Sequence, residues 1–461
     1  MTDFIPPAFA GVIYFSGNTE DITSSHPLVL QPLAGLPVLE QTLNVIQEVT
    51  GTTTTLIDEH GFKWRAEINS RGEDWLEVPD HSNFIKELEK RFTDQVKHVL
   101  LVPEDMPLVT ATSIEKIIVE HARLSGTDPS QAALTVVHFP RAEAPNQNQV
   151  LPGAITQTIK FSSQSSAPQN TQELHQSSAD VYCFSASWLW KIQSQIPTSL
   201  TATSLLDNLM QLASATGIPI NNIQIADPSQ GIKIRSRIDL ANAEAIFRDR
   251  KNRDLMVNGV TIIDPNTTYI DVQVKIGNNS IIYPNTHLRG KTSIGENCQI
   301  GPNSLIVDSE ISDRCKVTFS VAESAIIEED VDIGPFAHLR KGAHLAQGVH
   351  MGNYGEVKNS YLGPGTKMGH FSYIGDAIIG PNVNIGAGVI TANYDGSKKH
   401  QTEIGAGAFI GSDSMLIAPL KIGAGARTGA GSVVTKDVPP NSLAVGIPAR
   451  IIRKKEENDG P

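Results

Sequence analysis

Two cationic side chains and one histidine in the C-terminal half have residue types and spacing suited to chemistry on a small anionic molecule. Arg340 and Lys358 lie 18 residues apart, and His370 lies 17 residues after Asn353. Two cations on the same face of a structure form a clamp for a phosphate monoester, which a guanidinium can bind in bidentate fashion. A histidine, with its pKa near neutrality, suits general-base catalysis. From spacing alone, Arg340 and Lys358 could equally be a solvated basic pair on the surface, and His370 could be a structural or merely exposed histidine.

The element that must position these residues is a repeat with a period of six. Aliphatic side chains recur at this spacing, with some five-residue steps, and many are followed by glycine. They are Ile276, Ile282, Leu288, Ile294, Ile300, Ile306, Ile333, Leu339, Leu345, Met351, Val357, Leu362, Met368, Ile374, Ile379, Ile385, Ile404, Ile410, Leu416 and Ile422, continued by Thr428 and Val434. Period six fits short strands joined by tight turns, three strands to a triangular coil of about 18 residues. Stacked at about 4.8 Å, such coils form a parallel β-helix. The handedness does not follow from the spacing.

The rhythm fails once, between Ile385 and Ile404. The intervening residues GAGVITANYDGSKKHQTE are largely polar. A polar stretch of this kind is expected to leave the wall as a loop, and functional residues concentrate on loops held by rigid scaffolds.

Bulk composition predicts a two-domain protein of the cytoplasm. The chain has 461 residues, a net charge of −12 and a pI of about 5.5, which argues against a nucleic-acid partner. No apolar run reaches 18 residues, and the start MTDFIPPAFAGVIYF is a poor signal peptide, so no membrane association is expected. Three scattered cysteines, Cys183, Cys298 and Cys315, predict neither disulfides nor a zinc site.

The first half has a different character and predicts an α/β layered domain. All four tryptophans lie before residue 191, whereas 27 of the 37 glycines lie after residue 258. Residues 84–92 and 204–217 are expected to be helices, 98–103 a buried strand, and 161–178 a polar loop. A long helix is expected over 236–259. The predicted domains are 1–232 and 257–461, joined by a linker helix at 233–256.

The second half also carries a far more specific string than the hexapeptide repeat. It reads GNYGEVKNSYLGPGTKMGHFSYIGDAIIGPNVNIGAGVITANYDGSKKHQT. This string resembles the acetyltransferase domain of the bacterial bifunctional N-acetylglucosamine-1-phosphate uridyltransferase/glucosamine-1-phosphate acetyltransferase. The resemblance implies a left-handed parallel β-helix. It also implies transfer of acetyl from acetyl-CoA to the amine of glucosamine 1-phosphate, by a homotrimer and without a metal in that step.

The same resemblance implies roles for individual residues. His370 would be the general base and Glu356 its polarising neighbour. The sugar phosphate would contact Arg340, Lys358, Tyr373, Asn384 and Lys399. Acetyl-CoA would contact Ala387, Asn393, Tyr394, Ser412 and Ala430, with backbone amides near Asn393 and Tyr394 stabilising the oxyanion. The ending AVGIPARIIRKKEE resembles that of other hexapeptide acyltransferases and suggests Arg450 for the coenzyme's phosphates.

The first domain resembles the nucleotidyltransferase half of the same family, yet the family's catalytic parts are missing. LLVPEDMPLV places Asp105 at a vestigial magnesium position. The glycine-rich triphosphate loop is replaced by IYFSGNTEDI, and the lysine after proline by Leu28. The second metal-binding asparagine falls at Arg235 or Ser236, and HFPRAEAPNQNQV has no counterpart of the uracil-sugar strand. We therefore expect uridyl transfer to be lost.

The sequence thus predicts a glucosamine-1-phosphate N-acetyltransferase that supplies a precursor of UDP-N-acetylglucosamine and the cell wall. Two alternatives stay open. One is a bifunctional enzyme that also makes UDP-N-acetylglucosamine, and the other is a non-catalytic scaffold that binds sugar nucleotides. Another amino sugar phosphate as the true acceptor is also compatible with the sequence.

Overall fold

The computed structural model describes residues 9–14, 27–51, 55–58, 75–77, 84–92, 96–125, 133–140, 177–197 and 202–454. The chain divides into two units, Met1–Ile246 and Phe247–Pro461. The boundary lies within helix α8 (Arg237–Val257), which corresponds to the predicted linker helix. The predicted loop at 161–178 lies outside the described residues, except for its last two positions.

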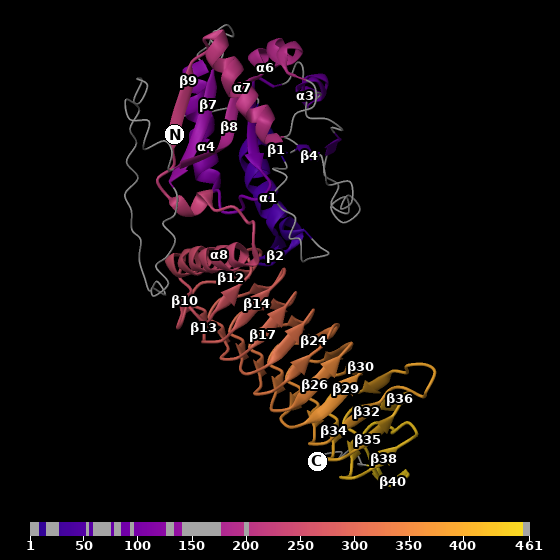
Figure 1. Cartoon of the computed structure of the whole chain (residues 1–461). Coiled ribbons are helices and arrows are strands. Elements are labelled where there is room, and N and C mark those ends of the chain that lie inside the picture. The colour runs from indigo at the N-terminus through magenta and orange to yellow at the C-terminus, as the bar shows by residue number, and fades with distance from the viewer. Residues whose placement is uncertain are drawn as a thin grey trace. The chain divides into compact units, whose positions relative to one another are not determined.

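The N-terminal unit is built on a seven-stranded sheet, coloured indigo to magenta in Figure 1. Its strands, in spatial order, are β5 (Trp75–Glu77), β4 (Thr55–Asp58), β1 (Phe9–Tyr14), β6 (His98–Pro103), β8 (Ser177–Ser185), β7 (Leu134–Pro140) and β9 (Ile220–Gln224). All neighbours are parallel except β8, which runs antiparallel to both β6 and β7. A small hairpin consists of β2 (Pro32–Leu33) and β3 (Leu36–Pro37).

Successive side chains of the central strands point to opposite faces of this sheet, and both sets are buried. Helices therefore cover both faces. On β6, Val99 and Leu101 belong to one apolar cluster, and Leu100 and Val102 to another. The helices are α1 (Val38–Thr50), α3 (Phe84–Phe92), α4 (Ala111–Ser125), α6 (Ala186–Ile192) and α7 (Ala202–Thr216), with 3-10 turns η1 (Leu28–Leu30), η5 (Gln193–Gln195) and η6 (Pro228–Gly231). The predicted α/β domain is confirmed. In the described ranges, no helix combines the length and apolarity required to span a bilayer.

Two histidines are buried side by side in this unit. The rings of His98 and His121 meet edge to face at 4.9 Å, and Phe9 stacks on His98 at 4.7 Å. His121 Nδ1 lies 2.8 Å from the Thr135 hydroxyl. Burial lowers the pKa of His98 to about 4, assisted by the charge of Lys97. Burial, with the charge of His98, lowers the pKa of His121 to about 3. Both imidazoles are therefore neutral in the folded protein at neutral pH.

Acidification is expected to destabilise the N-terminal unit. Below pH 6.5 the unfolded chain binds protons at these histidines and the folded chain does not. Their stabilising contribution is complete above that pH and is lost as the pH falls toward 4, by about 1.4 kcal/mol per pH unit for each histidine. Denaturant unfolding at pH 7.5, 6 and 5 measures this. His121→Asn should flatten the pH dependence and His138→Asn, at a more exposed position, should not; equal slopes in all three proteins would contradict the prediction.

The C-terminal unit is a parallel β-helix with three flat walls, shown in pink to yellow in Figure 1. One wall has ten strands: β11 (Tyr269–Ile270), β14 (His287–Arg289), β17 (Leu305–Val307), β20 (Val321–Glu323), β23 (His338–Leu339), β26 (Gly355–Lys358), β29 (Ser372–Gly375), β32 (Ile390–Ala392), β35 (Met415–Ile417) and β38 (Val433–Val434). We call it the ten-stranded wall.

The second wall has nine strands: β12 (Lys275–Ile276), β15 (Ser293–Ile294), β18 (Glu310–Ile311), β21 (Ile326–Ile327), β24 (Ala343–Leu345), β27 (Ser360–Leu362), β30 (Ala377–Ile379), β33 (Thr402–Ile404) and β36 (Leu420–Ile422). The third wall has twelve: β10 (Thr261–Ile262), β13 (Ile281–Ile282), β16 (Gln299–Ile300), β19 (Lys316–Val317), β22 (Asp332–Ile333), β25 (His350–Met351), β28 (Lys367–Met368), β31 (Asn384–Ile385), β34 (Phe409–Ile410), β37 (Arg427–Thr428), β39 (Ser442–Gly446) and β40 (Ala449–Lys454). The last pair, β39 and β40, is antiparallel and ends the described solenoid.

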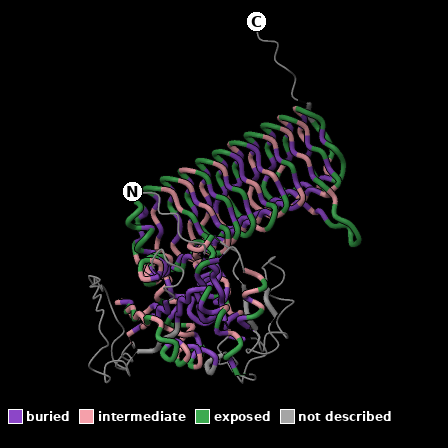
Figure 2. Tube along the Cα trace, turned by 90° about the horizontal axis from the view of Figure 1, so that it is seen from above, coloured by how far each residue is buried: buried purple, intermediate pink, exposed green. Residues whose placement is uncertain are grey.

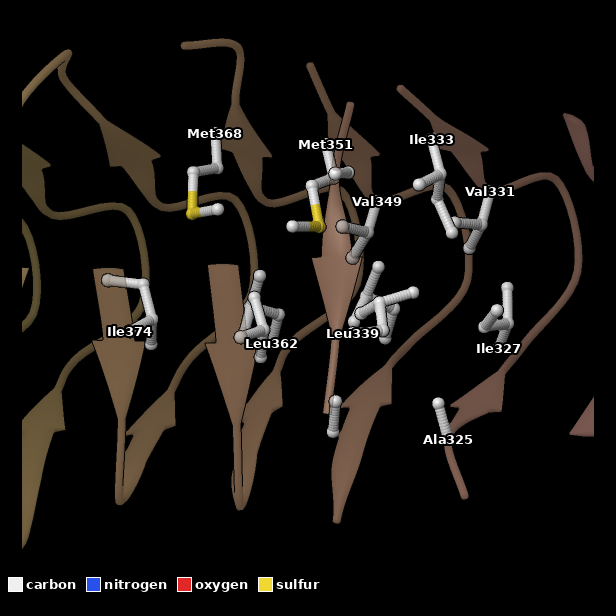
Figure 3. Packing of buried hydrophobic residues seen from close by; sticks show 14 of the residues in the cluster. Ala325, Ile327, Val331, Ile333, Leu339, Val349, Met351, Leu362, Met368 and Ile374 are labelled. Atoms are coloured by element: carbon white, nitrogen blue, oxygen red, sulfur yellow. The ribbon is translucent and has the colours of Figure 1, made fainter. Parts of the chain in front are cut away.

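The predicted six-residue phase is confirmed by the core. Most of the short strands turn an aliphatic side chain inward, and these stack layer upon layer, as Leu339, Met351, Leu362, Met368 and Ile374 do in Figure 3. Of the residues predicted from the repeat, Ile276 alone is only partly buried. Figure 2 shows the result as buried and exposed positions alternating along every coil. Successive coils pair in register, so sequence spacing converts directly into position on a wall.

The corners of the coils demand left-handed backbone, which asparagine and aspartate tolerate better than other non-glycine residues. One row of corner residues directly follows the strands of the ten-stranded wall. It includes Asp308 (φ 46°), Asn359 (φ 46°) and Asp376 (φ 51°). Their side chains are short and polar, so they can also bond the neighbouring coils. This row of corner residues borders the candidate site described below.

Candidate active site on the β-helix

Arg340 and Lys358 occupy adjacent layers of the ten-stranded wall, as their spacing predicts. Leu339 pairs with Val357, and the amide of Arg340 donates to the carbonyl of Val357 at 2.9 Å. Arg340 Nη1 donates to Glu356 Oε1 at 2.8 Å, which raises the pKa of the guanidinium. Glu356 is therefore the partner of Arg340 here, and no hydrogen bond joins it to His370. Its proposed influence on His370 stays a prediction.

Lys399, 41 positions beyond Lys358 in the chain, meets it on this wall. The close approach of the Lys399 amine lowers the pKa of Lys358, because two adjacent ammonium groups repel each other, and the charge of Arg340 lowers it further. Asp376 opposes this effect. Counting these groups with Glu356, three cations face two anions, and Glu323 in the coil before Arg340 adds a third negative charge near the guanidinium. A phosphate monoester carries about two negative charges at neutral pH and would relieve the repulsion between the lysines.

Tyr373 and Asn393 close over the backbone of Gly375, beside this cluster. A Cβ on Gly375 would collide with the Tyr373 hydroxyl and lie 2.8 Å from Asn393 Nδ2. Position 375 therefore requires glycine, because the Tyr373 and Asn393 side chains lie too close to its backbone for a Cβ. Tyr373 pairs with Glu356 across β26 and β29. We call Arg340, Glu356, Lys358, Tyr373, Asn393 and Lys399, with Asp376, the basic cluster.

The loop that brings Lys399 here is shorter than the sequence predicts. The coil continues through β32, where Thr391 replaces the inward-facing aliphatic residue. The Thr391 side chain is fully buried, and its hydroxyl accepts a hydrogen bond from the amide of Gly375 at 2.7 Å. Only residues 393–401 leave the wall, near β32 and β36 in Figure 1. A bridge between Tyr394 and Lys399 closes this loop, and Asp395 accepts from the amides of Ser397 and Lys398 at 2.8 and 2.7 Å. These donors, with His400, hold the pKa of Asp395 well below its ordinary value.

His370 lies at the corner between β28 and β29, where its side chain is exposed. The register places Asn353, His370, Ala387, Ser412 and Ala430 at the same corner in consecutive coils, each two residues after an inward-facing position. Two backbone bonds follow this column, from Asp413 to the Ala387 carbonyl at 2.6 Å and from Gly431 to the Ser412 carbonyl at 2.8 Å. We call these five residues the corner column. It joins the predicted base to three of the predicted acetyl-CoA contacts.

Of the remaining predicted contacts, Asn384 and Arg450 lie apart from the basic cluster, whereas Tyr394 follows Asn393 and forms a bridge with Lys399. Asn384 is on the twelve-stranded wall, paired with Lys367 and Phe409. Tyr394 is 61 % exposed on the loop. Arg450, on β40, pairs with Val445 at the end of the solenoid. Whether Asn384, Tyr394 and Arg450 contact ligands stays a prediction.

The structure also adds residues that pattern reasoning missed. Asp376 accepts from Asn359 Nδ2 at 2.6 Å and from Asn393 Nδ2. Its only sequence signal is its place after the close-packed Gly375 in the string SYIGDA. Neither a six-residue period nor a charge count distinguishes it from other corner aspartates.

Asp105, in the N-terminal unit, does not fit a magnesium site. Its carboxylate is fully buried, and Arg235 Nε lies 3.8 Å from Oδ2. A guanidinium at that distance repels a divalent cation. Leu28 is buried in the apolar core, while the segment 13–22, predicted to replace the triphosphate loop, lies outside the described residues except for its first two positions. In the described ranges no cluster of three or more His, Cys, Asp or Glu could hold a metal.

Comparison with known proteins matches both halves of the chain. The family model for "Bacterial transferase hexapeptide (six repeats)" matches residues 273–308, and that for "Hexapeptide repeat of succinyl-transferase" matches 401–436. Relatives named "Bifunctional protein GlmU" align along nearly the whole chain. The Streptococcus agalactiae serotype V (strain ATCC BAA-611 / 2603 V/R) protein is 31% identical over 463 residues, 98% of each chain.

Two further relatives of the same name agree. The Thermotoga petrophila protein is 34% identical over 454 residues, 96% of this chain and 97% of its own. The Carboxydothermus hydrogenoformans protein is 39% identical over 355 residues, 76% and 77% of the two chains. The predicted architecture, an α/β unit of the nucleotidyltransferase type followed by a left-handed parallel β-helix, is confirmed. Similarity of this extent, through both units and the hexapeptide repeats, establishes that the chain belongs to the family of the bifunctional protein GlmU.

Proposed function

We propose that this protein transfers acetyl from acetyl-CoA to the amine of glucosamine 1-phosphate. The observation that carries the proposal is the approach of Lys399 to Lys358 beside Arg340, because an anion bound there would relieve the repulsion between these cations. A sugar 1-phosphate held there would be next to the corner column with His370. The small side chains of Ala387, Ser412 and Ala430 leave room for a long thioester donor along that corner.

The chemistry assigns one role to each part. His370 takes a proton from the ammonium of the amino sugar, because a protonated amine has no lone pair to attack with. The amine then attacks the thioester carbonyl, a C–N bond forms, and the C–S bond breaks. The nitrogen gives up a second proton as the tetrahedral intermediate collapses. Of the two protons, one passes through His370 to the departing coenzyme A thiolate and the other goes to solvent. Backbone amides at Asn393 and Tyr394 would stabilise the tetrahedral oxyanion.

The family's name implies a second activity, which we propose this chain has lost. Uridyl transfer requires a metal beside Asp105 in the resembling domain, and Arg235 stands there instead. The N-acetylglucosamine 1-phosphate made here would then pass to a separate uridyltransferase in the cytoplasm. We further propose that the working unit is a homotrimer, with Asn384, Tyr394 and Arg450 completing the site beside a neighbouring subunit.

An acceptor screen tests the acetyltransferase proposal. Purified protein is mixed with acetyl-CoA and glucosamine 1-phosphate, glucosamine 6-phosphate, glucosamine or galactosamine 1-phosphate, and free coenzyme A thiol is followed. We expect glucosamine 1-phosphate to give a kcat/KM at least about 100-fold above that of glucosamine, because charge-assisted bonds to the phosphate contribute a few kcal/mol. Equal rates with and without the phosphate would refute the role of the basic cluster. No thiol release with any acceptor would instead favour a binding scaffold.

A further inference from the structure

Asp376 stands at the corner between β29 and β30, in left-handed backbone and directly after Gly375. Its amide donates to the carbonyl of Lys358 at 3.1 Å, so it is fixed to the coil that carries the central lysine of the basic cluster. Its side chain is half-buried.

The carboxylate of Asp376 joins three coils. Oδ1 accepts from Asn359 Nδ2 in the preceding coil at 2.6 Å, and Oδ2 accepts from Asn393 Nδ2 in the following coil. A carboxylate accepts at both oxygens, whereas an asparagine has one acceptor oxygen and one donor group. Aspartate can therefore accept from both amides as they stand, whereas an asparagine would pair with both only if one of the neighbouring amides turned over, and it would lose the charge.

The same residue holds both ends of the loop 393–401. Asn393, at its start, is bound by the carboxylate, and Thr402, just past its end, donates its amide to the Asp376 carbonyl at 3.2 Å. Across the neck of the loop, the amide of His400 donates to the Asn393 carbonyl at 2.7 Å. Lys399 is carried by this loop, so its position relative to Lys358 depends on Asp376.

We infer that Asp376 is a positioning residue of the acetyl-transfer site, which ties the loop carrying Asn393 and Lys399 to the coil carrying Lys358. The inference rests on the proposed function for its catalytic meaning, but the tie itself is independent of it. The carboxylate also supplies a negative charge next to the lysines, so the basic cluster stays assembled before an anionic substrate arrives.

Two readouts on Asp376→Asn test the inference, with Asp308→Asn as matched control. Asp308 has the same corner position and the same left-handed backbone conformation. Its carboxylate accepts a hydrogen bond from the backbone amide of Lys291, several coils away from the loop. The first readout needs no substrate: trypsin cleavage after Lys398 or Lys399, followed by mass spectrometry. We expect about tenfold faster cleavage in Asp376→Asn than in the parent or Asp308→Asn, because losing a charge-assisted bond favours opening of the loop.

The second readout is kinetic. We expect Asp376→Asn to raise the KM for glucosamine 1-phosphate about tenfold while the KM for acetyl-CoA changes less than twofold. A loss of general stability would alter both, and thermal unfolding beside Asp308→Asn measures that loss. If Asp376→Asn unfolds too readily, Asn393→Ala removes the same tie from the loop side and should show the same faster cleavage.

The outcomes separate the inference from the proposed function. Unchanged cleavage in both Asp376→Asn and Asn393→Ala overturns the positioning role, whatever the enzyme does. Faster cleavage in Asp376→Asn, together with no acetyl transfer by the parent protein, would uphold the tie and reject the function. Faster cleavage with both KM values unchanged would show that the tie does not serve the site, and would also overturn the inference.

Discussion

Replacing His370 with glutamine is expected to lower kcat for acetyl transfer to glucosamine 1-phosphate by about 10²–10⁴-fold, the usual contribution of a general base. Glutamine keeps the length and polarity of the side chain but cannot accept the amine's proton. His370 is exposed at the corner, in the same column as Ala387 and Ser412, so little packing is lost with it. The binding of glucosamine 1-phosphate, measured by calorimetry, should change by less than about threefold.

The matched control is His350→Gln. His350 is an exposed histidine on β25 of the same unit, and its Nδ1 lies 3.1 Å from Asp332. Its loss should leave kcat within about twofold, because an exposed ion pair contributes little. If His370→Gln released thiol as fast as the parent at saturating substrates, another group would have to be the base, and Glu356 would be the next residue to replace.

No uridyl transfer is expected from the N-terminal unit. Incubation with UTP, magnesium and N-acetylglucosamine 1-phosphate should release pyrophosphate at least about 10³-fold more slowly than an active uridyltransferase, because preorganised cation clamps on the phosphates supply much of the catalysis of such transfers. The physical reason lies in Asp105, which faces the Arg235 guanidinium instead of a metal. For the same reason, magnesium should not raise the unfolding temperature of this unit.

The decisive comparison uses Arg235→Asn, which places at that position the residue type that the resembling family uses for the metal. Magnesium should then stabilise the variant against thermal unfolding but not the parent. Steady pyrophosphate release by the parent, dependent on both UTP and the sugar phosphate, would show that the second activity survives and would refute its predicted loss.

The six-residue period by itself determined the solenoid and the layer that each residue occupies. Coils stack at a constant spacing, so residues one coil apart lie on the same wall, as Arg340 and Lys358 do. The same rule places Asn353 and His370 in successive coils, whereas the register of the structure adds Ala387, Ser412 and Ala430 to their corner column. In the first half, the apolar run of β6 and the amphipathic pattern of α3 were sufficient to predict the strand and helix at their observed bounds.

Only the tertiary structure decided what the side chains contact. Lys399 reaches Lys358 because the coil continues through Thr391 and only the loop 393–401 leaves it, and no spacing rule specifies that path. Glu356 bonds Arg340, and Asp376 ties the loop at both ends, because side-chain direction at a corner depends on the coils above and below. Likewise, Arg235 faces Asp105 from about 130 residues away in sequence. Local patterns determine layers and faces, whereas contacts between distant segments are set by packing.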